Sequence, residues 1–310
     1  MPAGPLNYGG WRKLLSTYPD IEVAEAILGI CQYGARIGYE GQRSTTTIYK
    51  NLPSALENPV IVTREISNEI SKNRLQCYPD AMTLPAHFTA SPLGLTDKSD
   101  GSKRRIHHLS FPVNDPSSIN SGISDEYGAI NYSRITEAIT AVQRHGRGCL
   151  LIKRDFENAF RHIPIAPVDT PLLSFEWRGK YYAERFLPFR LRTAPYLFNL
   201  FAETFHWVLQ EDLQREHISA DIVHYLDDFL AIIPPEESPV LYSRRFAELS
   251  DEVGLAIKES KSEQGTTVSF AGVEIDTVQM VIRLPPSKLD KARTIVKAAT
   301  NQNSLTLLDL

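Results

Sequence analysis

The clearest hydrophobic pattern in the chain surrounds a pair of adjacent acids. Ile222–Val223 and Phe229–Ile233 are runs of strand-forming residues, and Asp227–Asp228 lies between them. This pattern predicts a β-hairpin with two carboxylates at its tip. Neighbouring ionised carboxylates repel each other unless a cation lies between them, and hard oxygen ligands suit Mg²⁺. The alternative interpretation is a solvated turn, which is the commoner fate of such a dipeptide.

A third acid ends a second apolar pattern. Cys149–Ile152 predicts a buried strand, Asp155 stands at its C-terminal end, and Ala159–Phe160 follows shortly after. An acid at the C-terminal end of a buried strand is well placed to meet a ligand. The alternative is that Asp155 only caps the next turn.

Ahead of that strand the sequence predicts a basic hairpin. Residues 90–95 and 103–110 form its arms, and Asp100–Gly101 is a hairpin turn signal. Such a hairpin can close over a triphosphate or a nucleic-acid backbone, whereas a solvated basic turn is the alternative. His107 and His108 are expected to pack or to form hydrogen bonds, not to bind metal. The basic residues of the hairpin are Lys98, Lys103, Arg104 and Arg105.

Helical periodicity and turn signals account for most of the remaining chain. Asp20 is a candidate N-cap, Pro195 fits the first turn of a long helix, and residues 34–50 are polar and predict a loop. Residues 1–90 show no spacing typical of a chemical site, which favours a docking or packing role. The pattern predicts helices over 11–15, 21–33, 63–75, within 128–144, over 196–211 and 239–253, and from 286 onward, and it predicts hairpins over 172–186 and 268–284.

Composition is that of an ordinary globular chain. The 310 residues, 42% of them hydrophobic and 23% charged, suit one large domain or two modest ones. A net charge of −4 does not indicate a nucleic-acid binder, but local basic patches suffice for such binding. Three widely spaced cysteines indicate buried free thiols in a reducing compartment. With no apolar run of membrane-span length and no signal peptide, we expect an intracellular protein, cytoplasmic or nuclear, without membrane contact.

The order of these elements resembles that of reverse transcriptases. Six pieces in one order are hard to obtain by chance, and they cover about residues 93–284. Finer resemblance, to fungal-like DIRS-type retrotransposons that carry a tyrosine recombinase, rests on Tyr18–Asp20, Ala35–Tyr39 and Ile106–Ser110. The six pieces are the basic hairpin, Asp155 with Phe160, Leu187–Phe189, Tyr225–Asp228, Gly254–Leu255 with Lys261, and Phe270–Gly272.

The resemblance implies an α+β fold of the right-hand polymerase type, with fingers and a ferredoxin-like antiparallel palm sheet backed by helices. On this basis residues 1–90 are expected to form a helical N-terminal extension and residues 91–285 the fingers and palm. Residues 286–310 are expected to begin a truncated thumb or connection.

The resemblance also implies a two-metal centre. Nucleotidyl transfer uses two Mg²⁺ ions, with Mn²⁺ as a substitute, to activate a primer 3′-hydroxyl and to hold a triphosphate. Asp155 and Asp227 are the implied principal ligands, Asp228 the supporting one, and Phe156 can add only its backbone carbonyl. Lys261 is the implied proton donor to the leaving pyrophosphate.

Further residues are implied to contact nucleotide and primer. A bulky ring at Phe160 selects deoxynucleotides by excluding a 2′-hydroxyl, and Phe189 lines the pocket of the nascent base pair. Arg190 departs from the family pattern, which has glycine there so that backbone can approach the nucleotide. The triphosphate contacts are Lys98 and Arg104, and the primer contacts are Phe270, Ala271 and Gly272.

Three functions remain open at this point. The first is an active RNA-directed DNA polymerase that acts on an RNA or DNA template with primer and on dNTPs. The second is an inactive nucleic-acid-binding remnant, which Arg190 keeps open. The third is another two-metal palm enzyme such as a nucleotidyl cyclase, against which the basic hairpin and the Leu187–Phe189 loop argue. Further polyprotein domains, RNase H and recombinase, are expected partners absent from this chain.

Overall fold

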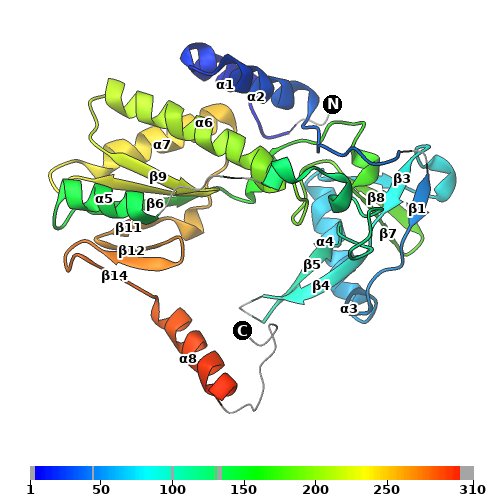
Figure 1. Cartoon of the computed structure of the whole chain (residues 1–310). Helices are drawn as coiled ribbons and strands as arrows, with labels where there is room; N and C mark the ends of the chain where they lie inside the picture. Colours follow the sequence, from blue (N-terminus) through cyan, green and yellow to red (C-terminus); the bar gives the residue numbers. More distant parts are fainter. Residues whose placement is uncertain (1–3, 44, 99–100, 129, 131–134, 301–310) are drawn as a thin grey trace. The chain divides into compact units, whose positions relative to one another are not determined.

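The computed structural model describes residues 4–43, 45–98, 101–128, 130 and 135–300 (Figure 1). The chain divides into two compact units, each made of several segments. The first unit comprises residues 1–131, 157–208 and 248–256, and the second comprises 132–156, 209–247 and 257–310. Among the helices of the described residues, none is long and apolar enough to cross a membrane.

The first unit is built on a five-stranded sheet in the order β1-β3-β7-β8-β2. A separate hairpin pairs β4 (Leu93–Asp97) with β5 (Lys103–His107). The strands of the larger sheet are β1 (Thr46–Ile48), β2 (Leu75–Tyr78), β3 (Phe88–Ala90), β7 (Ser174–Trp177) and β8 (Lys180–Glu184). The helices of this unit are α1 (Tyr8–Leu14), α2 (Ile21–Tyr33), α3 (Pro53–Leu56) and α4 (Pro59–Ser71).

One apolar cluster anchors the β4–β5 hairpin to the first unit. Val62 and Ile66 of α4 are buried together with Phe175 of β7. Leu93 and Leu95 of β4 belong to the same cluster. Because side chains alternate along a strand, burial of these two leucines fixes which face of the hairpin points to solvent.

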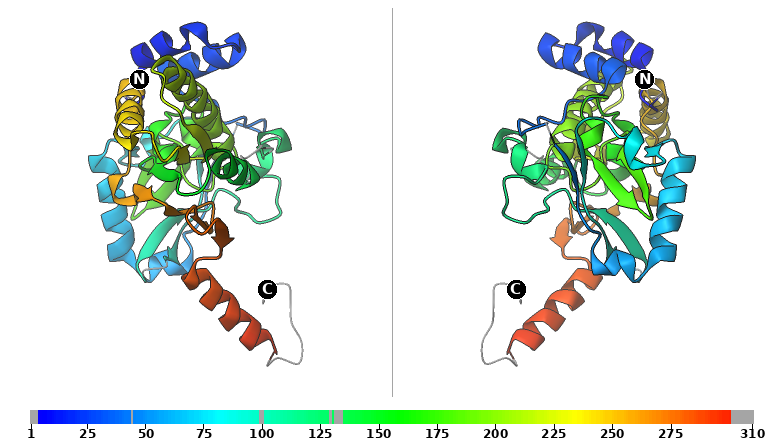
Figure 2. Two further views of the ribbon diagram at one scale, coloured as in Figure 1. Left: turned by 90° about the vertical axis from the view of Figure 1, so that its left-hand side faces the viewer. Right: turned by 90° about the vertical axis from the view of Figure 1, so that its right-hand side faces the viewer.

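The second unit holds a four-stranded antiparallel sheet in the order β11-β6-β10-β9 and a three-stranded sheet in the order β12-β13-β14. Helix α5 (Ile135–His145) packs on one face of the larger sheet, and α8 (Pro286–Thr300) extends from the end of β14 (Figure 2). The strands are β6 (Leu150–Asp155), β9 (Asp221–Tyr225), β10 (Asp228–Ile233), β11 (Glu263–Gly265), β12 (Thr267–Phe270), β13 (Val273–Asp276) and β14 (Val281–Arg283). Helices α6 (Ala194–Arg215) and α7 (Pro239–Val253) contribute residues to both units.

Strand β10 is covered on both faces. Leu230 and Ile232 share an apolar cluster with residues of α5. The ring of Phe229, which points to the other face, lies 5.8 Å from the ring of Phe246 on α7 and 5.4 Å from that of Phe156. Burial on both faces explains why the sequence of β10 is continuously apolar and does not alternate.

Most predicted elements are present. The hairpin around the acid pair, the basic hairpin and the helices over 21–33 and 239–253 are confirmed, as is the N-cap at Asp20. The long helix extends further than expected, from 194 to 215. The division of the chain at residues 90 and 285 stays a prediction.

Three expectations need correction. Residues 1–90 are not wholly helical, because β1, β2 and β3 lie there, and β2 and β3 pair with β8 and β7 far along the chain. The hairpin predicted over 268–284 has three strands instead of two, because residues 268–276 divide at residues 271–272 into β12 and β13. Of the three cysteines only Cys149 is buried, and Cys77 is exposed. The strand errors arise because β1, β2, β3, β12 and β13 have only three or four residues each, which is too short for a hydrophobic pattern to show.

A buried ionic network lies under the basic hairpin in the first unit. Glu184 of β8 accepts a hydrogen bond from Arg161 at 2.7 Å and another from Arg105 at 3.1 Å. Burial opposes the charge on Glu184, but Arg161 and Arg105 outweigh burial and lower its pKa to about 2. His107 of β5 is buried beside this network, with Nε2 2.9 Å from the Ser174 carbonyl oxygen.

We expect His107 to make the protein less stable in mild acid. Burial lowers the pKa of His107 from 6.5 to about 4, so between these values the unfolded chain binds a proton that the folded chain does not. The resulting loss in the free energy of unfolding is roughly 3 kcal/mol at most. His107→Gln keeps an N–H donor but cannot titrate. Urea unfolding at pH 7.5 and 4.5 measures the free energy of unfolding of both proteins, which should fall less with pH in the variant than in the wild type. An equal fall in both proteins would contradict this assignment.

Candidate active site

Strand register in the second unit brings two of the predicted acids side by side. β6 and β10 run antiparallel, and Asp155 at the end of β6 is paired directly with Asp228 at the start of β10. Directly opposed residues on antiparallel strands have their Cβ atoms about 4.5–5.5 Å apart. The two carboxylates therefore lie at the same end of the sheet, although they are 73 positions apart in the sequence.

Asp227 lies in the two-residue turn between β9 and β10, where Tyr225 is paired with Asp228. Leu226, the other turn residue, has a φ of +54°. The Asp227 carbonyl oxygen accepts a hydrogen bond of 3.1 Å from the backbone N–H of Phe156. This bond ties the turn to the end of β6, so Asp155, Asp227 and Asp228 come together at one place.

Burial and neighbouring acids raise the pKa values of Asp227 and Asp228. Burial is the largest cause of the raised pKa of Asp227, and the charge of Asp155 adds to it. Burial also raises the pKa of Asp228, to about 7, with further contributions from Asp155 and Asp227, against the lowering effect of Lys153. Within the described residues, Asp228 Oδ1 is buried without a hydrogen-bond donor. A cation beside such a cluster would favour the charged carboxylates.

Two lysines already lie against these acids. Lys261 Nζ is 2.7 Å from Asp155 Oδ2, and this hydrogen bond is the main cause of its raised pKa. Lys153 Nζ is 3.5 Å from Asp228 Oδ2 and donates to the Ser269 carbonyl oxygen at 3.0 Å. Lys261 was predicted as a site residue, whereas Lys153 was not. The signal for Lys153 is its place two residues before Asp155, on the same face of the strand.

The predicted primer-contact residues form the turn between β12 and β13. Phe270 is buried, 1% exposed, within the apolar core of the second unit. Ala271 and Gly272 make the turn itself with φ values of +46° and +86°, and the Gly272 carbonyl oxygen accepts from Lys288 Nζ at 3.0 Å. Of the three residues, only the turn backbone and Ala271 face solvent, so the ring of Phe270 acts as an anchor.

Phe156 was predicted to offer only its backbone carbonyl, and its side chain is consistent with that limit. The residue is 1% exposed, and its ring packs against those of Phe229 and Phe246. The ring therefore supports the sheet beneath the acids.

The predicted nucleotide contacts belong to the first unit, and three of them lie close together. The rings of Phe160 and Phe189 lie 5.4 Å apart, and the guanidinium carbon of Arg104 lies 5.8 Å from the centre of the Phe189 ring. Phe189 is 44% exposed, which is high for a large aromatic residue and leaves its ring open to a ligand. Lys98 follows β4 with its side chain exposed. We call Arg104, Phe189 and Phe160 the aromatic row.

Arg190 lies next to the aromatic row in a conformation that favours glycine. Its φ is +70°, in the left-handed region where a Cβ atom is disfavoured. The Arg190 carbonyl oxygen accepts a 2.8 Å hydrogen bond from Asn120 Nδ2. Arg190 therefore departs from the family pattern in its side chain, while its backbone keeps the left-handed conformation that favours glycine.

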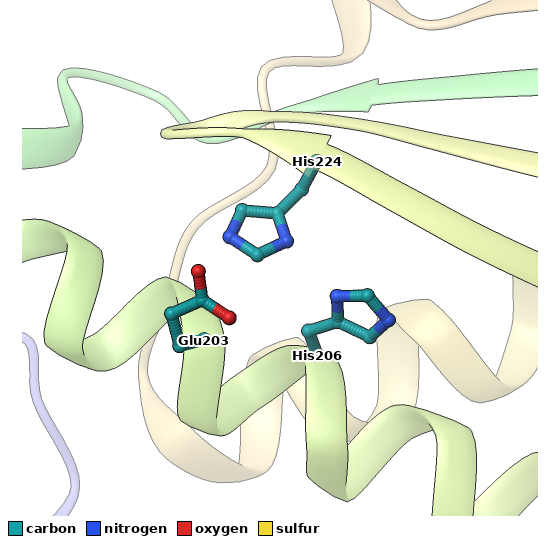
Figure 3. A group of neighbouring side chains, drawn as sticks. All are labelled: Glu203, His206 and His224. Carbon is teal, nitrogen blue, oxygen red and sulfur yellow. The ribbon is translucent and has the colours of Figure 1, made fainter. Parts of the chain in front are cut away.

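Figure 3 shows three other titratable side chains, with Glu203 and His206 on successive turns of α6 and His224 on β9. Glu203 and His206 belong to the first unit and His224 to the second. The ring of His224 stacks on that of Phe229 at 4.8 Å and 14°. His224 thus supports the hairpin that carries Asp227 and Asp228.

The family model described as reverse transcriptase (RNA-dependent DNA polymerase) matches residues 97–275, which is more than half of the chain. The chain belongs to the reverse transcriptase family. The match includes the second arm of the basic hairpin, all three acids, the aromatic row and Lys261.

Individual relatives agree with the family. Protein P of heron hepatitis B virus is 27% identical over 148 residues, which are 47% of this chain and 18% of that protein. The foamy viral protease-reverse transcriptase dRH in complex with dsDNA matches with a TM-score of 0.62 at 17% identity, over 97% of this chain and 50% of that one. The foamy viral protease-reverse transcriptase in complex with RNA/DNA hybrid gives a TM-score of 0.57 at 17% identity, over 93% and 37%. These structures support the α+β polymerase fold, and this chain spans half or less of each relative.

We expect Arg190→Gly to stabilise this reverse transcriptase chain by about 1 kcal/mol, because glycine removes the cost of an L-residue in the left-handed region. Arg190→Ala is the matched control, since it removes the guanidinium but keeps Cβ, and it should give no gain. Urea unfolding of the three proteins measures the difference. An equal gain in the free energy of unfolding in both variants would show that the effect comes from loss of the Arg190 guanidinium and not from the backbone conformation.

Proposed function

We propose that this chain is an RNA-directed DNA polymerase that extends a primer 3′-hydroxyl with dNTPs on an RNA or DNA template. The observation that carries the proposal is that Asp155, Asp227 and Asp228 come together at one end of the sheet, in a member of the reverse transcriptase family. Acids from two strands that are not adjacent in sequence can share a pair of metal ions, which is the arrangement that nucleotidyl transfer needs.

The acids fit divalent metal ions. They offer hard carboxylate oxygens, Asp228 Oδ1 is buried without a donor among the described residues, and the Lys261 ammonium already lies against Asp155. Two Mg²⁺ ions, or Mn²⁺ in their place, would supply charge for the attacking hydroxyl and for the triphosphate. Asp155 and Asp227 are the proposed principal ligands, with Asp228 in support and Phe156 through its carbonyl oxygen.

The chain's own residues have distinct proposed roles in the transfer. Lys261 holds its proton firmly, because its contact with Asp155 raises its pKa, and it is the proposed donor to the leaving pyrophosphate. The proton moves from Lys261 Nζ to a pyrophosphate oxygen. Ala271 and Gly272 offer the backbone of their turn to the primer strand. The buried ring of Phe270 holds this turn in place.

In the first unit, the aromatic row is the proposed wall of the nucleotide pocket. Arg104 and Lys98 bind the triphosphate by charge-assisted contacts. Phe189 lies against the nascent base pair, and Phe160 against the sugar, where its ring excludes a 2′-hydroxyl. The 5.4 Å separation of these two rings supports a shared pocket surface.

The finer assignment also remains a proposal. The N-terminal motifs favour a DIRS-type, fungal-like retrotransposon as the source of the family resemblance. Residues 91–285 are the proposed fingers and palm, and 286–310 the start of a thumb. RNase H and recombinase domains are proposed companions in a longer polyprotein.

An inactive nucleic-acid-binding remnant is the second candidate, and the side chain of Arg190 on a glycine-type backbone favours it. Primer extension on poly(rA)/oligo(dT) with Mg²⁺ separates the two. Incorporation of dTTP supports the polymerase, whereas template binding without incorporation supports the remnant.

Asp227→Asn should abolish primer extension and leave folding intact, because it removes one proposed ligand charge from a turn residue that lies outside the apolar core. The matched control is Asp221→Asn at the other end of β9, where Asp221 pairs with Arg144 at 2.9 Å. Extension of poly(rA)/oligo(dT) measures both variants. Retained activity in Asp227→Asn, or an equal loss in Asp221→Asn, would exclude Asp227 as a metal ligand.

Phe160→Ala should increase ribonucleotide incorporation relative to deoxynucleotide, because the smaller side chain leaves room for a 2′-hydroxyl. The ratio of kcat/KM for dTTP to that for UTP is the measured quantity, with a fall of about tenfold or more expected for loss of a contact worth roughly 1.4 kcal/mol. Phe198→Ala serves as a comparison, since Phe198 is 0% exposed and contacts Phe160 from the core side. An unchanged ratio in Phe160→Ala would place the sugar selection elsewhere.

A further inference from the structure

Asn120 uses its whole side-chain amide to hold the loop that follows Phe189. Its Oδ1 accepts from the Arg192 backbone N–H at 2.9 Å, and its Nδ2 donates to the Arg190 carbonyl oxygen at 2.8 Å. Its second Nδ2 hydrogen bonds to Ser110 Oγ at 2.8 Å. Because an amide group has only two N–H donors, both are committed here.

The backbone around Asn120 is held in place by a hydrogen bond and by buried neighbours. Its own N–H donates to the Leu109 carbonyl oxygen at 3.0 Å, and the flanking Ile119 and Ile123 are 1% and 2% exposed. Asn120 can therefore transmit the position of this segment to a loop far along the chain.

The two backbone contacts bracket one residue of the loop. Leu191, between Arg190 and Arg192, is 1% exposed. With the carbonyl before it and the N–H after it both held by Asn120, the peptide planes on either side of Leu191 have fixed orientations. This holds Arg190 in the left-handed conformation that its side chain disfavours, with Phe189 immediately before it.

We propose that Asn120 is a positioning residue for nucleotide binding, which compensates for the side chain at Arg190 and thereby sets the place of Phe189 in the aromatic row. The inference rests on the proposed polymerase function for its kinetic consequence. Among the described residues, the side chain of Asn120 hydrogen bonds only with backbone atoms of the loop and with Ser110, so it acts through the loop. The expected effect is on the KM for dNTP and not on kcat.

Asn120→Asp tests the donor to Arg190, because the acid keeps an acceptor for the Arg192 N–H but sets an oxygen against the Arg190 carbonyl. One neutral hydrogen bond predicts a rise of about three- to tenfold in the KM for dTTP, with kcat within about twofold. Asn120→Ala, which adds no charge, should move in the same direction. Ser110→Ala, which leaves both loop contacts in place, is the control and should change KM by less than about twofold.

The Arg190→Gly background makes the test specific. Glycine adopts the left-handed conformation unaided, so Asn120→Asp should there raise the KM by less than about twofold. An equal rise in both backgrounds, or a loss confined to kcat, overturns the proposal.

A measurement without catalysis separates this inference from the proposed function. Amide hydrogen exchange over residues 187–195 should become faster in Asn120→Asp and Asn120→Ala and stay at the wild-type rate in Ser110→Ala. If wild-type protein exchanges as expected but extends no primer, the polymerase proposal fails and the loop contact stands. Unchanged exchange in the Asn120 variants overturns the inference whether or not the protein polymerises.

Discussion

The proposed catalytic centre depends on one strand register, the pairing of Asp155 with Asp228 across β6 and β10. A shift of one residue would turn every side chain of β10 to the opposite face of the sheet. The two faces are not equivalent, because Phe229 packs against α7 and Leu230 against the α5 side. Core packing on both faces therefore holds the acids in place, and the chemistry at the end of the strand relies on apolar residues within it.

The same register is costly for folding. It places acids together in a partly buried setting, and burial with like charge raises the pKa values of Asp227 and Asp228. Lys153 and Lys261 offset part of this repulsion. The folded chain leaves the negative charge of the site incompletely neutralised, as the proposed binding of cations requires, which is a common exchange of stability for function.

In the first unit a buried carboxylate has the corresponding role. Glu184 binds Arg105 and Arg161, and these residues directly follow Arg104 and Phe160 in the chain. One interior group thus fixes the backbone next to two members of the aromatic row. An ionic network of this kind is valuable for the orientation it imposes more than for the energy it contributes.

The sequence by itself determined the elements whose signals are local: the hairpin at Asp227–Asp228, the strand ending at Asp155, the basic hairpin, and helices such as 239–253. The order of these motifs also indicated the family. Periodicity, turn residues and proline stops act over a few residues, so they can be read along the chain.

Only the tertiary structure decided which acids meet, that Phe270 is an anchor and not a surface contact, and that Arg190 keeps a backbone suited to glycine. It also revealed Lys153 and Asn120. Their partners lie about 70 to 120 residues away and are mostly backbone atoms, whose positions are set by strand pairing and loop packing. Backbone groups are the same in every residue, so contacts with them leave no mark in the amino-acid sequence.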